Sequence, residues 1–231
     1  MNSSIVSIGL SNPGAPIPQA EIARFMQLAH QLDGQERRKL DFLYRKSGID
    51  FRHSVLDDFQ KEEVDDFSFF PKNKELNPFP STSARMNVFE AEAGGLAEQA
   101  VRNALEQAEL EASSLTHLIL VSCTGMVAPG LELDLMRRLG IPSSVERYCI
   151  HFMGCYAAFT GLRLADQLVK ANPKSRVLVV SVELCTLHFQ KEYTEDNLLA
   201  NSLFGDGAAA ALVMQSEKGL QIKNYFSEVL W

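Results

Sequence analysis

The sequence predicts a layered α/β fold in which helices cover a mostly parallel central sheet. Short apolar runs alternate with amphipathic helical patterns through the second half of the chain. Two of these runs, residues 118–121 and 177–180, are almost wholly apolar. Strands buried on both faces of a parallel sheet have this composition. Alternating strands and helices, joined by right-handed crossovers, build such a layered sheet.

The first part of the chain predicts one strand and two helices. Residues 4–10 alternate enough to form a strand, which the turn residues at 11–14 end. Pro18 suits the first turn of a helix, and a second helix is predicted over residues 35–46 with Gly48 ending it. The apolar face of the first helix carries Ile22, Phe25, Met26 and Ala29 at helical spacing.

The middle of the chain predicts a surface excursion followed by a long helix. An acidic run at residues 57–66 and the prolines at 71, 78 and 80 indicate exposed, irregular structure. Residues 86–110 then follow a helical pattern that tolerates two adjacent glycines. Its expected inward side chains are Val88, Ala91, Leu96, Ala100, Ala104 and Leu105.

The remaining elements alternate along the second half. Helices are predicted over residues 131–139, 155–171 and 197–204. Strands are predicted over residues 118–121, 147–152, 177–180, 208–214 and 220–231.

Composition and charge indicate a globular protein that binds neither nucleic acid nor membrane. Of the 231 residues, 46% are hydrophobic and 22% charged, which suits one large α/β domain or two small ones. The formal net charge of −7 argues against a nucleic-acid partner. No apolar run approaches the roughly 20 residues that cross a bilayer. The N-terminus lacks the features of a signal peptide, so we expect a cytoplasmic protein.

The cysteines do not form a metal-binding or disulfide pattern. Cys123, Cys149, Cys155 and Cys185 show no CxxC spacing. Reduced thiols, no metal site and no bound cofactor are therefore expected.

Cys155 is the strongest candidate for chemistry. A predicted strand breaks at Gly154, and a helical pattern begins directly at the thiol. The N–H groups and dipole of a helix N-terminus favour a thiolate over a thiol, and a thiolate is a nucleophile for covalent acyl chemistry. The alternative is a structural cysteine that packs as a small hydrophobe.

Several motifs around Cys155 occur in a recognisable order. They are Thr116-His117-Leu118-Ile119, Thr124-Gly125, Pro129-Gly130, Gly154-Cys155-Tyr156-Ala157-Ala158, Leu162-Arg163-Leu164-Ala165, Arg176-Val177-Leu178-Val179-Val180 and Leu203-Phe204-Gly205-Asp206-Gly207-Ala208-Ala209-Ala210. Together they resemble the N-terminal half of type III polyketide synthases, the chalcone and stilbene synthase family of the thiolase superfamily. The resemblance extends over residues 1–231, most strongly at 115–214, and it implies one half of a thiolase-like αβαβα fold.

The resemblance implies a homodimeric acyltransferase. Such an enzyme loads an acyl group from acyl-CoA onto Cys155 and extends it with malonyl-CoA by decarboxylative Claisen condensation. It uses coenzyme A thioesters as substrates and needs no carrier protein. A thioester keeps the acyl carbonyl electrophilic, and helix N–H groups stabilise the developing oxyanion.

Five further positions carry roles that the resemblance implies. Phe204 matches the gatekeeper phenylalanine between the coenzyme A tunnel and the cavity, with an ordinary core aromatic as the alternative. Cys123, Cys185 and His188 fall where plant enzymes place threonines that line the cavity. Arg52 matches a coenzyme A phosphate contact, although its neighbours Asp50 and Phe51 replace basic residues of the plant enzymes.

Two acidic residues suit structural roles. Glu183 matches a buried glutamate of the family, and Asp206 is expected to shape the Gly205-Asp206-Gly207 turn.

The resemblance also implies that a second half of the fold lies outside this chain. Family members draw a histidine and an asparagine from that half, and these stabilise the thiolate and the enolate. We expect the chain to be inactive in condensation without them. We also expect an uncovered sheet face and active-site wall, and hence association or poor solubility.

Two other functions fit the same motifs. A condensing enzyme of the ketoacyl synthase III type shares the glycine-aspartate-glycine turn, although the residues around Cys155 favour the polyketide family. A non-catalytic half-chain that binds a full-length partner is the other alternative.

Overall fold

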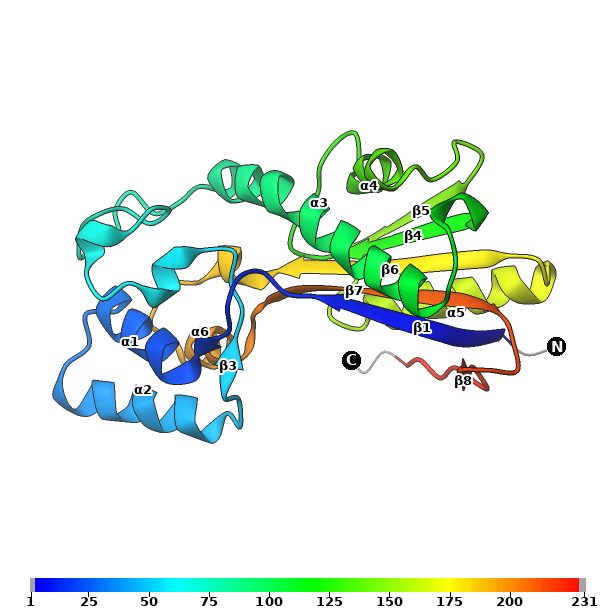
Figure 1. The fold of residues 1–231 in the computed structure, drawn as a ribbon. Helices are drawn as coiled ribbons and strands as arrows, with labels where there is room; N and C mark the ends of the chain where they lie inside the picture. The colour runs from blue at the N-terminus through cyan, green and yellow to red at the C-terminus, as the bar shows by residue number, and fades with distance from the viewer. Residues whose placement is uncertain (1–2, 229–231) are drawn as a thin grey trace. The chain divides into compact units, whose positions relative to one another are not determined.

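A computed structural model of the protein describes residues 3–228 (Figure 1). The α-helices are α1 Gln19–Ala29, α2 Gly34–Lys46, α3 Thr82–Gln107, α4 Leu131–Leu139, α5 Ala157–Ala171 and α6 Glu195–Leu203. The strands are β1 Ser3–Ser11, β2 Ile17–Pro18, β3 Phe51–Arg52, β4 His117–Ser122, β5 Glu146–His151, β6 Arg176–Leu184, β7 Asp206–Gln215 and β8 Leu220–Gln221. Short 3-10 helices η1 Asp57–Gln60, η2 Val64–Asp66, η3 Ala112–Ser114 and η4 Cys185–His188 complete them.

The described residues form two compact units. Unit 1 comprises the described residues up to Ser11, Ala93–Val182, and the described residues from Ala208 onward. Unit 2 comprises Asn12–Glu92 and Glu183–Gly207. The assignment of residues 1–231 to one domain stays a prediction.

Unit 1 contains the central sheet, and its α/β class is the predicted one. The six strands follow the order β5-β4-β6-β7-β1-β8. Strand β4 runs parallel to both β5 and β6, whereas β1 runs antiparallel to β7 and β8. A one-residue irregularity between Ile5 and Ser7 shifts the β1–β7 register.

Helix α5 covers one face of this sheet. Ile119 and Val121 of β4 and Val177 and Val179 of β6 form a buried cluster with residues of α5. Gly161 lets the helix approach closely, because a Cβ there would lie 3.0 Å from a Val179 methyl group. The alternate residues Leu118, Leu120, Leu178 and Val180 are also buried, as in strands covered on both faces.

Helix α3 packs against β1 at a glycine. A Cβ at Gly9 would collide with the backbone of Ala100 and Ala104. Glycine at this position therefore permits a close contact between helix and strand that no larger residue allows.

Phe25 forms the centre of the unit 2 core. Its ring lies 4.5 Å from that of Phe59, 5.5 Å from those of Phe67 and Phe70, and 5.6 Å from that of Phe189. Each such pair contributes about 0.5–1.5 kcal/mol beyond its buried area. Packing among these rings accordingly joins α1 to the irregular segments that follow α2 and β6.

The predicted surface excursion at residues 57–66 was wrong for Asp58 and Phe59, which are buried. The Asp58 carboxylate accepts hydrogen bonds from the backbone N–H groups of Ser68, Phe69 and Phe70 at 2.7–3.3 Å. A buried carboxylate with several N–H donors is satisfied without solvent. The acidic run therefore holds one anchor for an irregular segment among exposed neighbours.

Element boundaries differ from prediction at α3 and at the last strand. Helix α3 begins at Thr82 and ends at Gln107, and Ala91 is exposed while Phe89, Ala93, Ala97 and Val101 are buried. Ala100, Ala104 and Leu105 are buried as predicted, and Val88 and Leu96 are partly buried. Small residues mark a helical face weakly, which explains the error at Ala91. The last strand is only Leu220–Gln221, residues 222–228 are irregular, and residues 229–231 of the predicted strand lie outside the described residues.

Two further findings concern membranes and disulfides. Across residues 3–228 no helix has the length and apolarity to span a bilayer. None of the four cysteines, all of which lie in this range, takes part in a disulfide.

His30 makes the stability of unit 2 sensitive to acid. Its ring lies 5.7 Å from Phe189 and 5.5 Å from Tyr193, and its buried Nε2 makes no hydrogen bond with any described residue. Burial lowers the pKa of His30 below 6.5, and the charge of Lys191 adds to the effect while a hydrogen bond with the Lys191 backbone opposes it. The folded state thus disfavours protonated His30.

We expect the melting temperature to fall by a few degrees as the pH drops below about 6.5. In that range His30 binds a proton in the unfolded chain more readily than in the folded chain. His30→Gln does not titrate and should weaken this dependence. Thermal unfolding of both proteins at pH 8 and pH 5.5 measures the difference. Equal pH dependence in the two proteins would contradict the assignment.

Candidate functional site

Cys155 lies in a sharp turn between β5 and α5. The strand ends at His151, and the helix begins at Ala157 with Tyr156 as its N-cap residue. The backbone N–H of Ala157 donates to the Gly154 carbonyl oxygen at 3.1 Å, which closes the turn. The helix was predicted to begin at the thiol, whereas Cys155 precedes the N-cap residue by one position.

Two residues of this turn have left-handed backbone conformations. Phe152 has φ of 57° and Gly154 has φ of 81°. Glycine adopts this conformation freely, but a phenylalanine there costs about 1–2 kcal/mol. The reversal from strand to helix within five residues requires both.

The side chains around Cys155 are exposed and largely apolar. Cys155 itself is exposed, and Phe152 and Phe159 expose 67% and 66% of their surfaces. Met153 and Tyr156 are exposed as well. Large apolar side chains gathered on one short segment are typical of a surface that another protein segment or a ligand covers.

Cys123 lies beside the same turn. It follows the end of β4, and its Sγ is 3.6 Å from the Gly154 carbonyl oxygen. Strands β4 and β5 are parallel and pair Ser122 with His151, so their carboxyl ends meet at one edge of the sheet. The structure therefore brings Cys123 into contact with the residue that precedes Cys155 in unit 1.

The environment of the Cys149 thiol disfavours its ionised form. Burial raises the pKa of the Cys149 thiol to about 12, and the hydrogen bond and charge of Glu132 add to the effect. Glu132 is itself buried and pairs with Arg147 at 3.0 Å. Cys149 is therefore held in the thiol form although the residue as a whole is exposed.

In unit 2 the structure brings Arg52 and Phe204 together. The Arg52 side chain is only 7% exposed. Its Nη1 donates to the carbonyl oxygen of Phe204 at 2.5 Å and to that of Asn201 at 2.9 Å. The Phe204 residue is 47% exposed, so it is not an ordinary core aromatic. The predicted contact of Arg52 with a coenzyme A phosphate stays a prediction.

Cys185 and His188 are the first and last residues of η4. Both are partly buried. Between them, Thr186 donates to Asp206 from its backbone N–H at 2.8 Å and from its hydroxyl at 2.6 Å. Asp206 is the first residue of β7, so the predicted turn at 205–207 was wrong. Glu183 is half-buried rather than fully buried.

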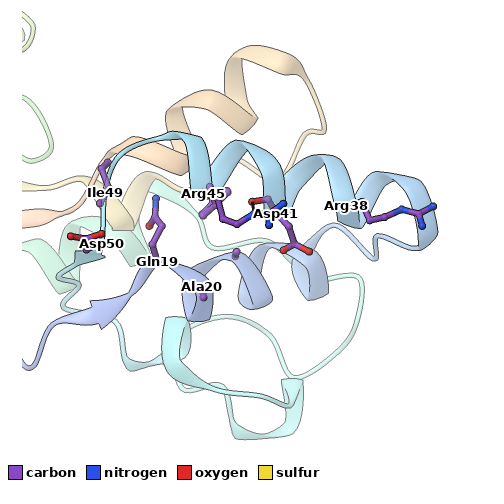
Figure 2. Close-up of a pocket in the computed structure, with 9 residues that line it drawn as sticks. Gln19, Ala20, Arg38, Asp41, Arg45, Ile49 and Asp50 are labelled. Atoms are coloured by element: carbon purple, nitrogen blue, oxygen red, sulfur yellow. Dashed lines mark hydrogen bonds between the residues drawn. The ribbon is translucent and has the colours of Figure 1, made fainter.

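A pocket of about 600 Å³ lies between α1 and α2 in unit 2 (Figure 2). Arg38, Asp41 and Arg45 come from successive turns of α2, and Gln19 reaches up from the start of α1. Neither helix carries a ligand-binding motif, so this pocket was not predicted from the sequence. Within the described part of the chain, no three His, Cys, Asp or Glu side chains gather to hold a metal ion.

Comparison with known proteins identifies relatives of the chain. Residues 2–217 match the family described as chalcone and stilbene synthases, N-terminal domain. "Probable polyketide synthase 1" of Dictyostelium discoideum is 32% identical over 212 residues, which are 92% of this chain and 6% of that protein. The "alpha-pyrone synthesis polyketide synthase-like Pks18" of Mycobacterium tuberculosis is 32% identical over 187 residues, 80% of this chain and 45% of that protein.

Solved structures show the same similarity. The C-terminal type III polyketide synthase domain of "Steely1", a type I/III hybrid from Dictyostelium, superposes with a TM-score of 0.82 at 29% identity, over 96% of this chain and 58% of that one. PKS-I from the brown alga Ectocarpus siliculosus gives a TM-score of 0.83 at 29% identity, over 92% and 56%. The predicted fold is thereby confirmed, and the chain spans less than half the length of these curated relatives.

We expect Cys155 to react with iodoacetamide about tenfold or more faster than Cys149 at pH 8. The reason is that Cys149 is held protonated, and each pKa unit changes the thiolate fraction tenfold. Peptide mass spectrometry after timed labelling measures both rates. Glu132→Gln should speed the labelling of Cys149 and leave that of Cys155 unchanged. Faster labelling of Cys149 in the parent protein would contradict the comparison.

Proposed function

The chain belongs to the chalcone and stilbene synthase family through its N-terminal domain, and from this we propose that it is the acyl-loading half of a type III polyketide synthase. The observation that carries the proposal is Cys155, an exposed thiol in a sharp turn one residue before the N-cap of α5. Exposure of the sulfur supports access by a substrate carbonyl, and we assign stabilisation of the oxyanion to backbone N–H groups.

Acyl loading at Cys155 is a thioester exchange. The Cys155 thiolate attacks the acyl-CoA carbonyl and forms a tetrahedral oxyanion, which collapses as the bond to the coenzyme A sulfur breaks. Coenzyme A leaves as a thiolate and takes up a proton, and the acyl group stays on Cys155. The energies of the two thioesters are similar, so the step needs orientation and oxyanion stabilisation more than a strong base.

Chain extension follows on the loaded enzyme. Malonyl-CoA loses carbon dioxide, the resulting enolate attacks the acyl carbonyl, and the Cys155 thiolate leaves. We assign stabilisation of this enolate to the histidine and asparagine that the family resemblance places in the second half of the fold. The chain spans 45% of a Mycobacterium relative and 58% of the Steely1 domain, which leaves room for such a half.

The other candidate residues receive roles in this reaction. We assign Phe204 to the passage between coenzyme A and the growing chain, and Cys123, Cys185 and His188 to the cavity wall. The contact of Cys123 with the Gly154 carbonyl supports its assignment. For Arg52 we retain the coenzyme A phosphate contact as a proposal. Its hydrogen bonds to the Asn201 and Phe204 carbonyl oxygens support a structural role in addition.

A homodimer completes the proposal. Strand β5 lies at one edge of the sheet, and every one of its residues is at least partly exposed. An edge strand presents unsatisfied N–H and C=O groups that a second strand can pair. The apolar side chains next to Cys155 add surface that association would bury. Cytoplasmic location likewise belongs to the proposal.

In the complete enzyme, Cys155→Ala should abolish transfer of an acyl group from acyl-CoA to the protein, because the attacking sulfur is removed. Intact-protein mass spectrometry after incubation with acyl-CoA measures the loading. Cys149→Ala is the matched control and should load normally. Undiminished loading of the Cys155→Ala protein would refute the assignment.

The 231-residue chain assayed alone should release no condensation product from acyl-CoA and malonyl-CoA, because enolate stabilisation is assigned to the second half. Product analysis by mass spectrometry, with the complete enzyme as positive control, tests this expectation. Multiple-turnover product from the chain alone would show that its own residues stabilise the enolate.

A further inference from the structure

A buried polar network surrounds the backbone next to Phe204, the residue that follows α6 in unit 2. Arg52 Nε donates to Gln19 Oε1 at 2.9 Å, and Gln19 Nε2 donates to the Ser202 carbonyl oxygen at 2.8 Å. Tyr44 Oη donates to the Asn201 carbonyl oxygen at 2.9 Å. Arg52, Gln19 and Tyr44 are all more than nine-tenths buried. Side chains from β3, α1 and α2 thus converge on one backbone segment.

That segment is the carboxyl end of α6. The helix ends at Leu203, and the carbonyl groups of its last turn have no partners within the helix. No basic residue of α6 itself lies in that turn. Arg52 supplies the missing cation from another element, and its Nη1 reaches the carbonyls of both Asn201 and Phe204. A cation at a helix carboxyl end is stabilised by the helix dipole.

The other side of Phe204 is fixed as well. The Asp206 carboxylate accepts hydrogen bonds from the backbone N–H of Val55 and from Thr186, and the Asp206 N–H donates to the His53 carbonyl at 2.9 Å. A Cβ on Gly205 would lie 3.3 Å from the His53 carbonyl oxygen. The backbone is therefore held immediately before and immediately after the Phe204 side chain.

An arginine at position 52 can donate to all of these acceptors at once, whereas a lysine cannot. Two nitrogens of Arg52 serve three acceptors, namely Gln19 Oε1 and the two carbonyl oxygens. The single ammonium of lysine cannot reach the same acceptors from one position. The remaining nitrogen, Nη2, is buried without a hydrogen bond to any described residue. The guanidinium also lies over the Tyr44 ring, 5.7 Å from its centre, so Nε, Nη1 and this ring contact set the geometry.

We propose that Arg52, supported by Gln19, is a positioning residue that fixes the backbone of Phe204 and so determines which acyl groups pass it. The inference rests on the role proposed for Phe204. Arg52 acts on selectivity through the Phe204 backbone and does not touch the reacting atoms. Loss of these Arg52 hydrogen bonds lets the Phe204 ring move aside for longer acyl groups.

The test compares Arg52→Lys and Gln19→Leu with the parent in the complete enzyme. Arg24→Lys is the matched control, because Arg24 lies in the same unit with its side chain 56% exposed. The first measurement is hydrogen–deuterium exchange of the peptide that contains residues 201–206. The second is the ratio of kcat/KM for loading a long-chain and a short-chain acyl-CoA. The third is the alkylation rate of Cys155.

In Arg52→Lys and Gln19→Leu we expect faster exchange at 201–206 and a long-to-short ratio raised on the order of threefold. Cys155 alkylation should stay at the parent rate, and Arg24→Lys should match the parent throughout. If Arg52→Lys does not fold, Gln19→Leu decides. A folded variant with parental exchange and a parental ratio overturns the inference.

Failure of the proposed function gives a different result. If the parent enzyme does not load Cys155 at all, the proposed function is wrong. Hydrogen–deuterium exchange at residues 201–206 then decides alone whether Arg52 holds the Phe204 backbone. If the parent loads normally and the ratio does not move, the function stands and the selectivity role of Arg52 is refuted.

Discussion

Parallel pairing of β4 with β5 and β6 is the constraint on which the candidate site depends. The pairing sets Ser122 opposite His151, so both strands end at one edge of the sheet. Beyond that edge the chain must turn into α5 within five residues, and left-handed backbone at Phe152 and Gly154 makes the turn possible. Because the strands end together, Cys155 lies in an exposed turn, and Cys123 contacts the residue before it.

The sequence predicted elements well wherever residue type marked both ends. Helix α4 occupies the predicted residues 131–139, because Gly130 and Gly140 flank it and Gly140 adopts the left-handed conformation. The buried strands β4 and β6 were found through their continuous apolar runs. In helix α3 the prediction held for Ala100, Ala104 and Leu105 and failed at Ala91, because small residues mark a helical face weakly. The local pattern was therefore enough to locate an element where a distinct residue type marked a helix end or a wholly buried strand.

In the candidate site, too, local features could be predicted from the sequence and long-range contacts could not. Cys155 was identifiable because strand, glycine and helix are consecutive in the chain. The contacts of Arg52 were not, because its partners Gln19, Asn201 and Phe204 are 33, 149 and 152 positions away. Burial of Asp58 was equally hidden, since an acidic run gives no sign of which carboxylate will meet backbone N–H groups ten residues on. Long-range polar contacts depend on the finished fold.

The strand that leads to Cys155 is also the least supported strand of the parallel set. All residues of β4 are buried between two neighbours, whereas β5 pairs with β4 alone and carries Glu146, Arg147 and Cys149 as exposed residues. A strand held along one edge opens more readily than one held along both. Pairing at the open edge of β5 would therefore stabilise the turn that follows it. Through this strand, association of two chains would make the Cys155 turn more rigid.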